Sequence, residues 1–360
     1  MLKIPAKTLT ISVSLTSIGK KEISKLCLYS IVIWYLVLFV ACQSEEKEPI
    51  NNNEPSIFEW LNEEEVINLE LRGDLSHLLK ESHTEDHYHP AQIFLERGES
   101  QLKLDIEIAR RGVTRKRICD FPPIKLKFPK KVLREHGFSE FTTYKLVTHC
   151  LEFEKELVLK EYLVYKLFNQ LTDKSFKVQL ANTKYFDDSQ NLHSNHTHFG
   201  FLIESNKELA NRLEGKLVNP EKRKITTVDK EQYKNMVLFQ YMIGNTDWNI
   251  TKGHNIKWVQ TAALNAPTPI PYDFDYCGLV DAPYAVPHPQ LPIKNVRERL
   301  LQWRGKSTEE LLPICEEFKT KKDHFIQLCN EIEDLDADTK KDVIAFIETF
   351  FKEVEDGIFL

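Results

Sequence analysis

The fold of this chain is decided by the stretch Gly244-Asn245-Thr246-Asp247-Trp248-Asn249, followed by His254-Asn255-Ile256 and then by Pro271-Tyr272-Asp273-Phe274-Asp275. These segments gather acids and amides next to apolar runs. Phosphoryl transfer with a metal ion needs one Asp that positions or deprotonates the acceptor, and an Asn and a second Asp that hold the metal bridging the phosphates. The order of the acids and amides here is the order that this chemistry requires.

The N-terminus has the features of an export signal. Five lysines precede an apolar run at residues 26–41, which is short for a membrane span and typical of a secretory signal. Val40-Ala41-Cys42 resembles a bacterial lipobox, in which the Cys becomes lipidated and forms the new N-terminus. We therefore expect a signal peptide with lipobox at 1–41 and an acidic, Asn-rich tether at 42–56. A plain signal anchor with an incidental Cys is the alternative.

Composition and charge limit the nature of the chain beyond the signal. The 360 residues are 42% apolar, enough for a large core in two domains or in one domain with two lobes. Residues 1–41 hold five Lys and one Glu, so the remainder carries 43 basic and 53 acidic residues, a net charge of −10. This balance disfavours nucleic acid as a partner, because nonspecific nucleic-acid binding depends on neutralising phosphates.

Hydrophobic periodicity predicts an α+β fold. Alternation with a period of two predicts strands at 91–95, 102–108, 124–128, 142–147, 176–181, 183–186 and 199–203. A strong helical pattern covers 153–171, so we expect 57–204 to form a β-rich N-terminal lobe with one long helix. Helical spacing then dominates at 209–214, 230–243 and 309–359. We expect 205–360 to form a mainly helical C-terminal lobe that carries the catalytic and metal-binding loops, with a Pro-rich irregular stretch at 263–292.

Several blocks resemble atypical kinase-like proteins around the CotH spore-coat kinases and, more distantly, the HipA and lipid-kinase relatives. They are Arg111-Gly112, Tyr144-Lys145-Leu146-Val147, Glu161, Gly200-Phe201-Leu202-Ile203-Glu204, Gly244-Asn245-Thr246-Asp247, His254-Asn255 and Tyr272-Asp273-Phe274-Asp275. Residues 60–305 are also similar to a set of bacterial secreted proteins and lipoproteins, through blocks such as Cys119-Asp120-Phe121-Pro122-Pro123. The resemblance implies a two-lobed, protein-kinase-like fold.

The kinase resemblance implies a role for five residues around a nucleotide. Lys145 would bind the phosphates, and Glu161 in the following helix would orient it. Glu204 would lie at the lobe junction near adenine, and Asp247 would be the catalytic acid. No G-x-G-x-x-G loop is present, so the basic turn around Arg111, at residues 110–115, is the candidate substitute for binding phosphate.

The implied cofactors are ATP and Mg²⁺ or Mn²⁺. Asn255 is the best match for the metal-binding Asn because a short strand is expected to follow it. Asp273 would hold the metal, with Asp275 as the substitute. The usual interval from catalytic Asp to Asn is about five residues, whereas Asp247 to Asn255 is eight, so either 251–253 is an insertion or Asn249 is the metal-binding residue.

Other functions fit some of the same residues. Asp273, Asp275 and Asp281 alternate with apolar residues and could bind calcium, although no EF-hand spacing is present. Asp247 and Asp273 could be the paired carboxylates of a glycoside hydrolase, with nearby aromatic residues as sugar platforms: Trp248, Trp258, Tyr272 and Tyr276. A buried Lys145–Glu161 pair would favour the kinase over the hydrolase.

The remaining candidate ligands and nucleophiles are histidines and cysteines. Two His groups lie in polar segments, at residues 83–89 and 193–198, and we expect exposed loop residues rather than a metal site there. After the signal the cysteines are Cys119, Cys150, Cys277, Cys315 and Cys329; because their number is odd and their spacing wide, no disulfide framework or zinc pattern can be argued from them. Cys119 and Cys150 lack a recognisable catalytic base.

The sequence thus predicts an exported kinase-like protein, lipid-anchored at Cys42 to the bacterial cell envelope, with the outer-membrane surface as a candidate location. The expected function is transfer of a phosphoryl or nucleotidyl group from Mg-ATP to a protein or glycan acceptor. The alternative is an inactive pseudokinase-like surface lipoprotein that binds a ligand.

Overall fold

The computed structural model describes residues 54–62, 66–81, 87–152, 154–189, 197–219 and 227–357. All of these lie in the part of the chain from Asn51 onward. The expected signal peptide, Cys42 and most of the expected tether lie outside the described residues. Among the helices that are described, none is long and apolar enough to cross a membrane.

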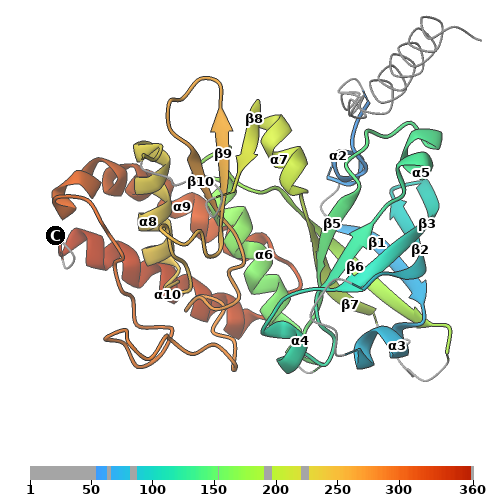
Figure 1. Cartoon of the computed structure of the whole chain (residues 1–360). Coiled ribbons are helices and arrows are strands. Elements are labelled where there is room, and N and C mark those ends of the chain that lie inside the picture. The colour runs from blue at the N-terminus through green and yellow to red at the C-terminus, as the bar shows by residue number, and fades with distance from the viewer. Residues whose placement is uncertain are drawn as a thin grey trace, which may run out of the picture. The chain divides into compact units, whose positions relative to one another are not determined.

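Seven strands form a closed barrel (Figure 1). In chain order they are β1 (Val66–Gly73), β2 (His89–Arg97), β3 (Ser100–Arg110), β4 (Ile124–Lys127), β5 (Thr143–Val147), β6 (Val178–Asp187) and β7 (Thr197–Ile203). The spatial order is β1, β2, β3, β4, β5, β7, β6, and β1 closes the barrel by pairing parallel to β6. Alternating inward side chains fill the barrel, as Ile67, Leu69 and Leu71 do from β1.

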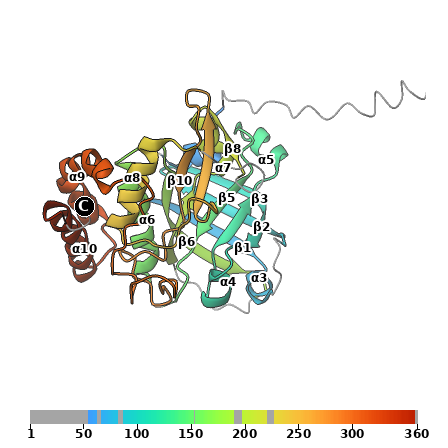
Figure 2. The same cartoon turned by 60° about the vertical axis from the view of Figure 1, so that its left-hand side comes forward.

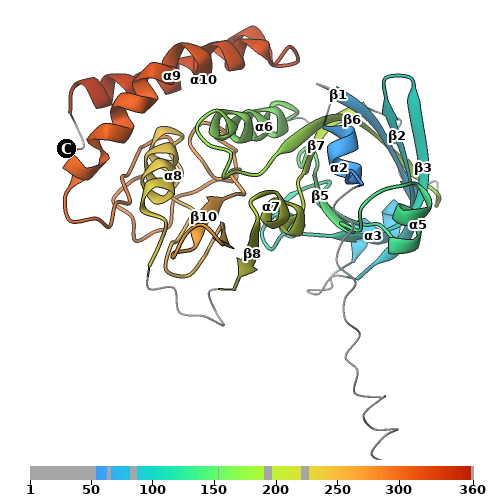
Figure 3. The same cartoon turned by 90° about the horizontal axis from the view of Figure 1, so that it is seen from above.

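Short helices flank the barrel strands. They are α2 (Ile57–Leu61), α3 (Leu75–Lys80), α4 (Arg115–Ile118) and α5 (Lys130–Glu135). In Figure 3, α2 lies against the barrel strands, where Phe58 stacks on Tyr144 of β5 with ring centroids 6.1 Å apart. Ser56 and Glu59 form a capping box that starts α2. The last residue of the expected tether, Ser56, therefore belongs to the folded part of the chain.

The long helix α6 (Glu156–Asn169) joins the barrel to the later helices. These are α7 (Asn206–Arg212), α8 (Lys230–Met242), η1 (Thr308–Leu311), α9 (Leu312–Glu331) and α10 (Ala337–Glu355). Figure 2 shows α6 between the barrel and the α9–α10 pair. Its side chains are buried around most of its circumference, in one core with residues of β7, α8, α9 and α10. The predicted helices and the α+β class are confirmed.

A second, smaller sheet was largely missed by the sequence analysis. It consists of β8 (Gly215–Val218), β9 (Ile256–Thr261) and β10 (Thr268–Pro271), in the order β10, β9, β8. The short strand expected after Asn255 is β9. The other two lie in segments expected to be helical or irregular; β10 contains two prolines, which an edge strand tolerates because its outer N–H side pairs with no neighbour.

A disulfide joins Cys119, at the end of α4, to Cys150, beyond β5. The cysteine spacing did not indicate this bond, because it forms only where the barrel brings two segments 31 residues apart into contact: Phe121 N–H donates to the Cys150 carbonyl at 3.0 Å. Neither thiol is then available as a nucleophile. The other described cysteines, Cys277, Cys315 and Cys329, are buried and free.

His149, next to the disulfide, is held neutral by its surroundings. It is 2% exposed and stacks between Phe121 and His198, with ring centroids 5.3 and 3.7 Å away. Burial lowers its pKa to about 3, and His198 contributes to the shift. The carboxylate of Glu152 lies 3.5 Å from Nε2 but is largely solvated, so it does not offset the burial.

This shift predicts acid sensitivity. The unfolded His149 takes up a proton near pH 6.5 and the folded one near pH 3, so its contribution to stability is complete above pH 6.5 and is lost as the pH falls below that value. Between pH 7 and pH 5 the loss should be about 2 kcal/mol. In urea unfolding, His149→Gln should reduce the fall in the free energy of unfolding between pH 7 and pH 5 by that amount. His324→Gln, at an exposed position of α9, should leave that fall unchanged. Equal losses in wild type and His149→Gln would contradict the assignment.

Candidate functional site

Asp247 is held in an exposed position by two amide side chains. The buried Asn245 accepts from Asp247 N–H at 2.9 Å, and Asn255 Nδ2 donates to the Asp247 carbonyl and to its Oδ2 at 2.8 and 3.0 Å. Gly244, with φ +65°, turns the chain out of the end of α8; a Cβ there would press on the Val296 carbonyl at 3.0 Å. The side chain of Asp247 remains 41% exposed, so a second molecule can reach it.

The structure distinguishes the two candidate Asn residues. Asn249 and His254 exchange two backbone hydrogen bonds of 3.1 Å, and Asn249 Oδ1 accepts from Lys252 N–H, so the side chain of Asn249 closes a tight turn. This turn accommodates the extra residues between Asp247 and Asn255, so the two side chains still meet. Asn255, and not Asn249, contacts Asp247.

Asp273 adjoins this pair because two strands of the small sheet run side by side. Asn255 precedes β9 and accepts through its carbonyl from Tyr272 N–H at 3.1 Å, and Asp273 follows directly. Both Asn255 and Asp273 have positive φ, +53° and +66°. Such strained backbone needs support and is common at functional sites. Asp273 N–H donates to the hydroxyl of Tyr165, from α6, at 2.9 Å.

Arg115 binds the acids behind Asp273. Its Nε donates to Asp275 at 2.7 Å, and its Nη2 donates to Glu161 at 2.8 Å and to Asp273 at 3.4 Å. The side chains of Arg115, Glu161 and Asp275 are at most 7% exposed. Oxygens of the three carboxylates lie within 4.8 Å of one another, and the second oxygen of Glu161 is buried with no hydrogen-bond partner.

The expected Lys145–Glu161 pair is therefore absent from the described residues. Glu161 binds Arg115 instead, because α4 inserts this arginine between α6 and the 273–275 segment. The Nζ of Lys145 lies 3.4 Å from Asn206 Oδ1 and 4.6 Å from the ring centroid of Tyr272.

The surrounding charges separate the three acids by pKa. Burial raises the pKa of Glu161 to about 7, against the opposing charge of Arg115. Burial also raises the pKa of Asp275. Burial acts on Asp273 in the same direction, but Arg115, Arg111 and Lys145 together hold its pKa below the usual range. Asp273 is thus the acid that stays ionised, and Glu161 exchanges a proton near neutral pH.

Lys145 lines a cavity of about 420 Å³ that is rich in positive charge. Its wall is formed by Arg111, Lys125, Thr142, Thr143, Lys145, Ser205, Asn206, Lys207 and Leu217. Burial lowers the pKa of Lys145 well below its usual range, and the charges of Arg111 and Lys257 lower it further. A hollow of about 370 Å³ continues from Asn206 and Leu217 to Lys252, Lys257 and Trp258. The four basic side chains of the cavity wall give it a positive potential, which favours an anionic ligand.

The arginines of the 110–115 turn have different roles. Arg111 lines the cavity, as expected for a residue that binds phosphate. Arg110 donates to the backbone carbonyls of Leu79, Glu81 and Lys116. Arg115 is buried among the acids. Of these three, only Arg111 is placed to bind a ligand in the cavity.

Glu204 does not match its expected role. It is 1% exposed, its carboxylate accepts from Arg212 Nε and Nη2 at 2.8 and 2.9 Å, and it also accepts from Lys177 N–H at 3.1 Å. This carboxylate is fully occupied in joining α7 to β6. The residues after it, Ser205 and Asn206, line the cavity instead.

Two alternative sites lose support. Asp281 lies 3.6 Å from Arg297 and is outside the cluster of Glu161, Asp273 and Asp275, so the expected calcium set does not assemble in the part of the chain described. Trp248 and Trp258, the latter in β9, are 5% and 2% exposed and belong to one buried cluster, so neither ring offers a face to a sugar.

Comparisons with known proteins yield a likeness in structure. No protein-family model matches the chain, and no curated protein matches it. The crystal structure of a Helicobacter pylori proinflammatory kinase, CtkA, is similar over 65% of this chain and 87% of that chain, with 12% sequence identity and a TM-score of 0.36. So low a score adds no argument about function. The resemblances to CotH kinases and to secreted lipoproteins stay predictions.

Sequence analysis missed the residues that connect the site. Arg115 was grouped with the phosphate-binding turn, and nothing in its local pattern distinguishes it from Arg111. His254 was quoted but had no role; its Nε2 lies 3.0 Å from Asp247 Oδ1, and it also acts electrostatically on Asp273. Tyr165 looked like one more apolar position of a helix. These roles depend on contacts across more than 100 residues or on loop geometry.

The Arg115 cluster predicts a large, pH-dependent loss of stability. Arg115→Ala should lower the free energy of unfolding by about 3–5 kcal/mol at pH 8, because it leaves buried carboxylates without a cation. The loss should be smaller at pH 6, since Glu161, with a pKa of about 7, is then protonated. Urea unfolding at both pH values measures this, with Arg117→Ala, an exposed neighbour on α4, as the control. A loss below about 1 kcal/mol at pH 8 would refute the cluster.

Proposed function

We propose that this chain has a two-lobed, protein-kinase-like fold and transfers a phosphoryl group from a metal-bound nucleoside triphosphate to an acceptor outside the cytoplasm. The observation that supports this most is the convergence at Asp273. The Asn255 carbonyl accepts from the N–H of Tyr272, the residue before Asp273, and His254, which contacts Asp247, acts electrostatically on Asp273. Lys145, which lines the cavity, also acts electrostatically on Asp273.

Asp273 and Asn255 would hold the metal, Mg²⁺ or Mn²⁺. Asp273 is ionised and its side chain is 34% exposed, which suits a hard cation that keeps some of its water. Asn255 donates both its contacts through Nδ2, which leaves the amide oxygen as its ligand atom. Asp275 is less suited because Arg115 and Tyr284 occupy its carboxylate. When bound, the metal would supply positive charge that offsets the charge of the phosphates.

Arg111 and Lys145 would bind the phosphates from the cavity side. In the free protein they repel each other, and this repulsion is one cause of the low pKa of Lys145. A polyanion between them would remove the repulsion and favour the charged ammonium. Its binding energy would therefore include relief of an unfavourable charge arrangement, with no change in fold.

Asp247 would position the acceptor hydroxyl and take its proton. Asn255 fixes one carboxylate oxygen, and the other faces His254. A carboxylate held at a defined place and open to solvent is what this step requires. His254, whose side chain is 55% exposed, is the first group to which Asp247 could pass the proton.

A pseudokinase is the second candidate, and one observation favours it. Arg115 neutralises Glu161 and Asp275, so the lysine–glutamate pair that a kinase uses to orient its phosphate-binding lysine is not formed. In this case the chain is a surface lipoprotein whose cavity binds an anionic ligand without chemistry.

The proposed location is the bacterial cell envelope, through a lipid on Cys42. The Cys119–Cys150 disulfide supports export, because such bonds persist in oxidising compartments. The acceptor is then an exported protein or a glycan. The net negative charge of the chain argues against nucleic acid.

The test is a Mg²⁺-dependent ATP titration of the full-length protein in detergent, followed by a turnover assay with exported proteins and glycans. Lys145→Ala and Asp273→Asn should each weaken binding at least tenfold. Asp247→Asn should keep binding and lower turnover by a factor of about 10² or more. Lys184→Ala, a strand lysine away from the cavity, and Asp323→Asn, at an exposed position of α9, are matched controls.

The outcomes separate the candidates. Binding that both site variants abolish, together with turnover, supports the kinase. The same binding without turnover on any acceptor supports the pseudokinase. A folded wild type that binds no nucleotide with either metal refutes both nucleotide-dependent interpretations and leaves only the binding of another anion.

A further inference from the structure

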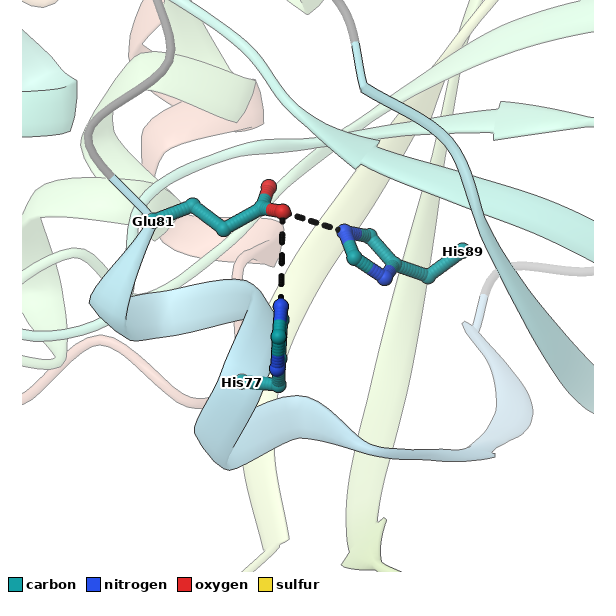
Figure 4. Close-up of side chains that lie close together, drawn as sticks. All are labelled: His77, Glu81 and His89. Atoms are coloured by element: carbon teal, nitrogen blue, oxygen red, sulfur yellow. Dashed lines mark hydrogen bonds and ion pairs between the residues drawn. The ribbon is translucent and has the colours of Figure 1, made fainter.

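We propose that His77, Glu81, His87 and His89 form a binding site for a divalent transition metal, with Zn²⁺ as the ion that fits the donor set best. The site lies where α3 ends and β2 begins, and it shares no residue with the cation-lined cavity. Figure 4 shows His77 and His89 turned toward the carboxylate of Glu81. His87 approaches the same oxygen, so the four side chains make one cluster.

Three ring nitrogens already lie around one carboxylate oxygen. The distances to Glu81 Oε1 are 2.6 Å from His87 Nδ1, 2.8 Å from His89 Nε2 and 3.7 Å from His77 Nε2. Zinc bonds of about 2.0–2.1 Å in a tetrahedron place ligand atoms roughly 3.3 Å apart. The observed distances bracket this value, so small side-chain rotations would admit an ion among the four atoms.

Hydrogen bonding accounts for only two of the three imidazoles around Glu81. His87 Nδ1 and His89 Nε2 lie within hydrogen-bond distance of Oε1, which has two lone pairs, whereas His77 Nε2 approaches the same oxygen at 3.7 Å, too far for a hydrogen bond. The side chain of Glu81 is 9% exposed. A cation among the four groups would bind the third imidazole as well as the other two. Three imidazoles and one carboxylate are ligands that zinc accepts.

The backbone prepares the site from both sides. His77 and Glu81 are four residues apart at the end of α3, so they share one face. Arg110 donates to the carbonyls of Leu79 and Glu81, which fixes this end of the helix. His89 is fixed by its pairing with Ile108 in the barrel. The side chains of His77 and His87 are 60% and 57% exposed, so an ion can reach the site from solvent.

One nearby charge opposes the ion. Arg110 interacts electrostatically with Glu81 and brings a positive charge toward the site. Its guanidinium donates to backbone carbonyls, so it is held beside the site and does not occupy the position of the ion. Arg110 should reduce the affinity without abolishing binding.

A second histidine cluster does not have ring nitrogens that converge on one ion. His149 and His198 approach Glu152, with Nε2 to carboxylate distances of 3.5 and 3.9 Å. Their rings are stacked 3.7 Å apart at 13°, so the lone pairs in the ring planes run nearly parallel and cannot meet at one ion. The rings of His87 and His89 lie at 86°, which lets their nitrogens converge.

Metal binding would connect α3 to β2 and fix the residue between two ligands. Tyr88 lies between His87 and His89, and its ring is 5.6 Å from Lys125 Nζ and 4.7 Å from Lys127 Nζ. Lys125 also lines the cavity. The ion would thus stabilise the barrel at a place that contacts the cavity wall, without itself taking part in the reaction.

The test is calorimetric titration of metal-free, full-length protein with ZnCl₂ at pH 7.5, without nucleotide. We expect one equivalent to bind to the wild type. His77→Ala and His89→Ala should each weaken binding at least tenfold, and the double variant should lose this equivalent. Glu81→Gln, which keeps the shape but removes the charge, should also weaken it. His136→Ala and His324→Ala, both exposed and outside the cluster, are matched controls that should bind as the wild type does.

Two further measurements keep the result interpretable. Co²⁺ in place of Zn²⁺ should give the intense visible absorption of a four-coordinate site, and that absorption should disappear in the double variant. Binding should weaken at pH 5.5, where protons compete for the imidazoles. If His89→Ala does not fold, His87→Ala replaces it, because His87 is exposed. Absence of binding, or Zn²⁺ binding that these variants leave unchanged, would overturn the proposal.

Discussion

Arg115 is the contact on which the arrangement of the site depends. One buried guanidinium binds acids from α6 and from the segment after β10, and it comes from a turn between barrel strands β3 and β4. Three parts of the chain that are distant in sequence therefore meet at one charge. Buried ion pairs of this kind add little net stability compared with an apolar core, but they define which surfaces fit together. Here the pairing holds Asp273 at the boundary between the barrel and the helices.

The charges around Asp273 are sorted by sign. Acids with raised pKa values lie behind it, around Arg115, and cations lie in front, around the cavity. An acid between these groups is ionised even though it is largely enclosed. Electrostatic preorganisation of this kind is what phosphoryl transfer requires, because the protein supplies positioning and charge and forms few covalent bonds. The same sorting would also serve a protein that binds a polyanion without chemistry.

Local patterns in the sequence predicted much of this structure. Alternation located β2 to β7, helical spacing located α6 and α8, and the apolar run after Asn255 located β9. Failures came where a contact spans the fold. The sequence could not show that Glu161 pairs with Arg115 and not with Lys145, because both cations precede it and no local pattern distinguishes them. The 119–150 disulfide and the His77 cluster depend on barrel closure, which no spacing encodes. β8 and β10 are too short for periodicity to distinguish them from loops.

The disulfide has a consequence for when the protein becomes complete. Cys119 ends the helix that carries Arg115, and its partner Cys150 follows the strand that carries Lys145. The bond therefore joins the two chain segments that supply Arg115 and Lys145, two of the cations that act on Asp273. It closes a loop whose restriction contributes about 3–4 kcal/mol in the chain-entropy description. If the chain is exported as proposed, it would leave the reducing cytoplasm with these two segments unjoined and acquire the bond in the oxidising compartment. Completion of the site would then follow export.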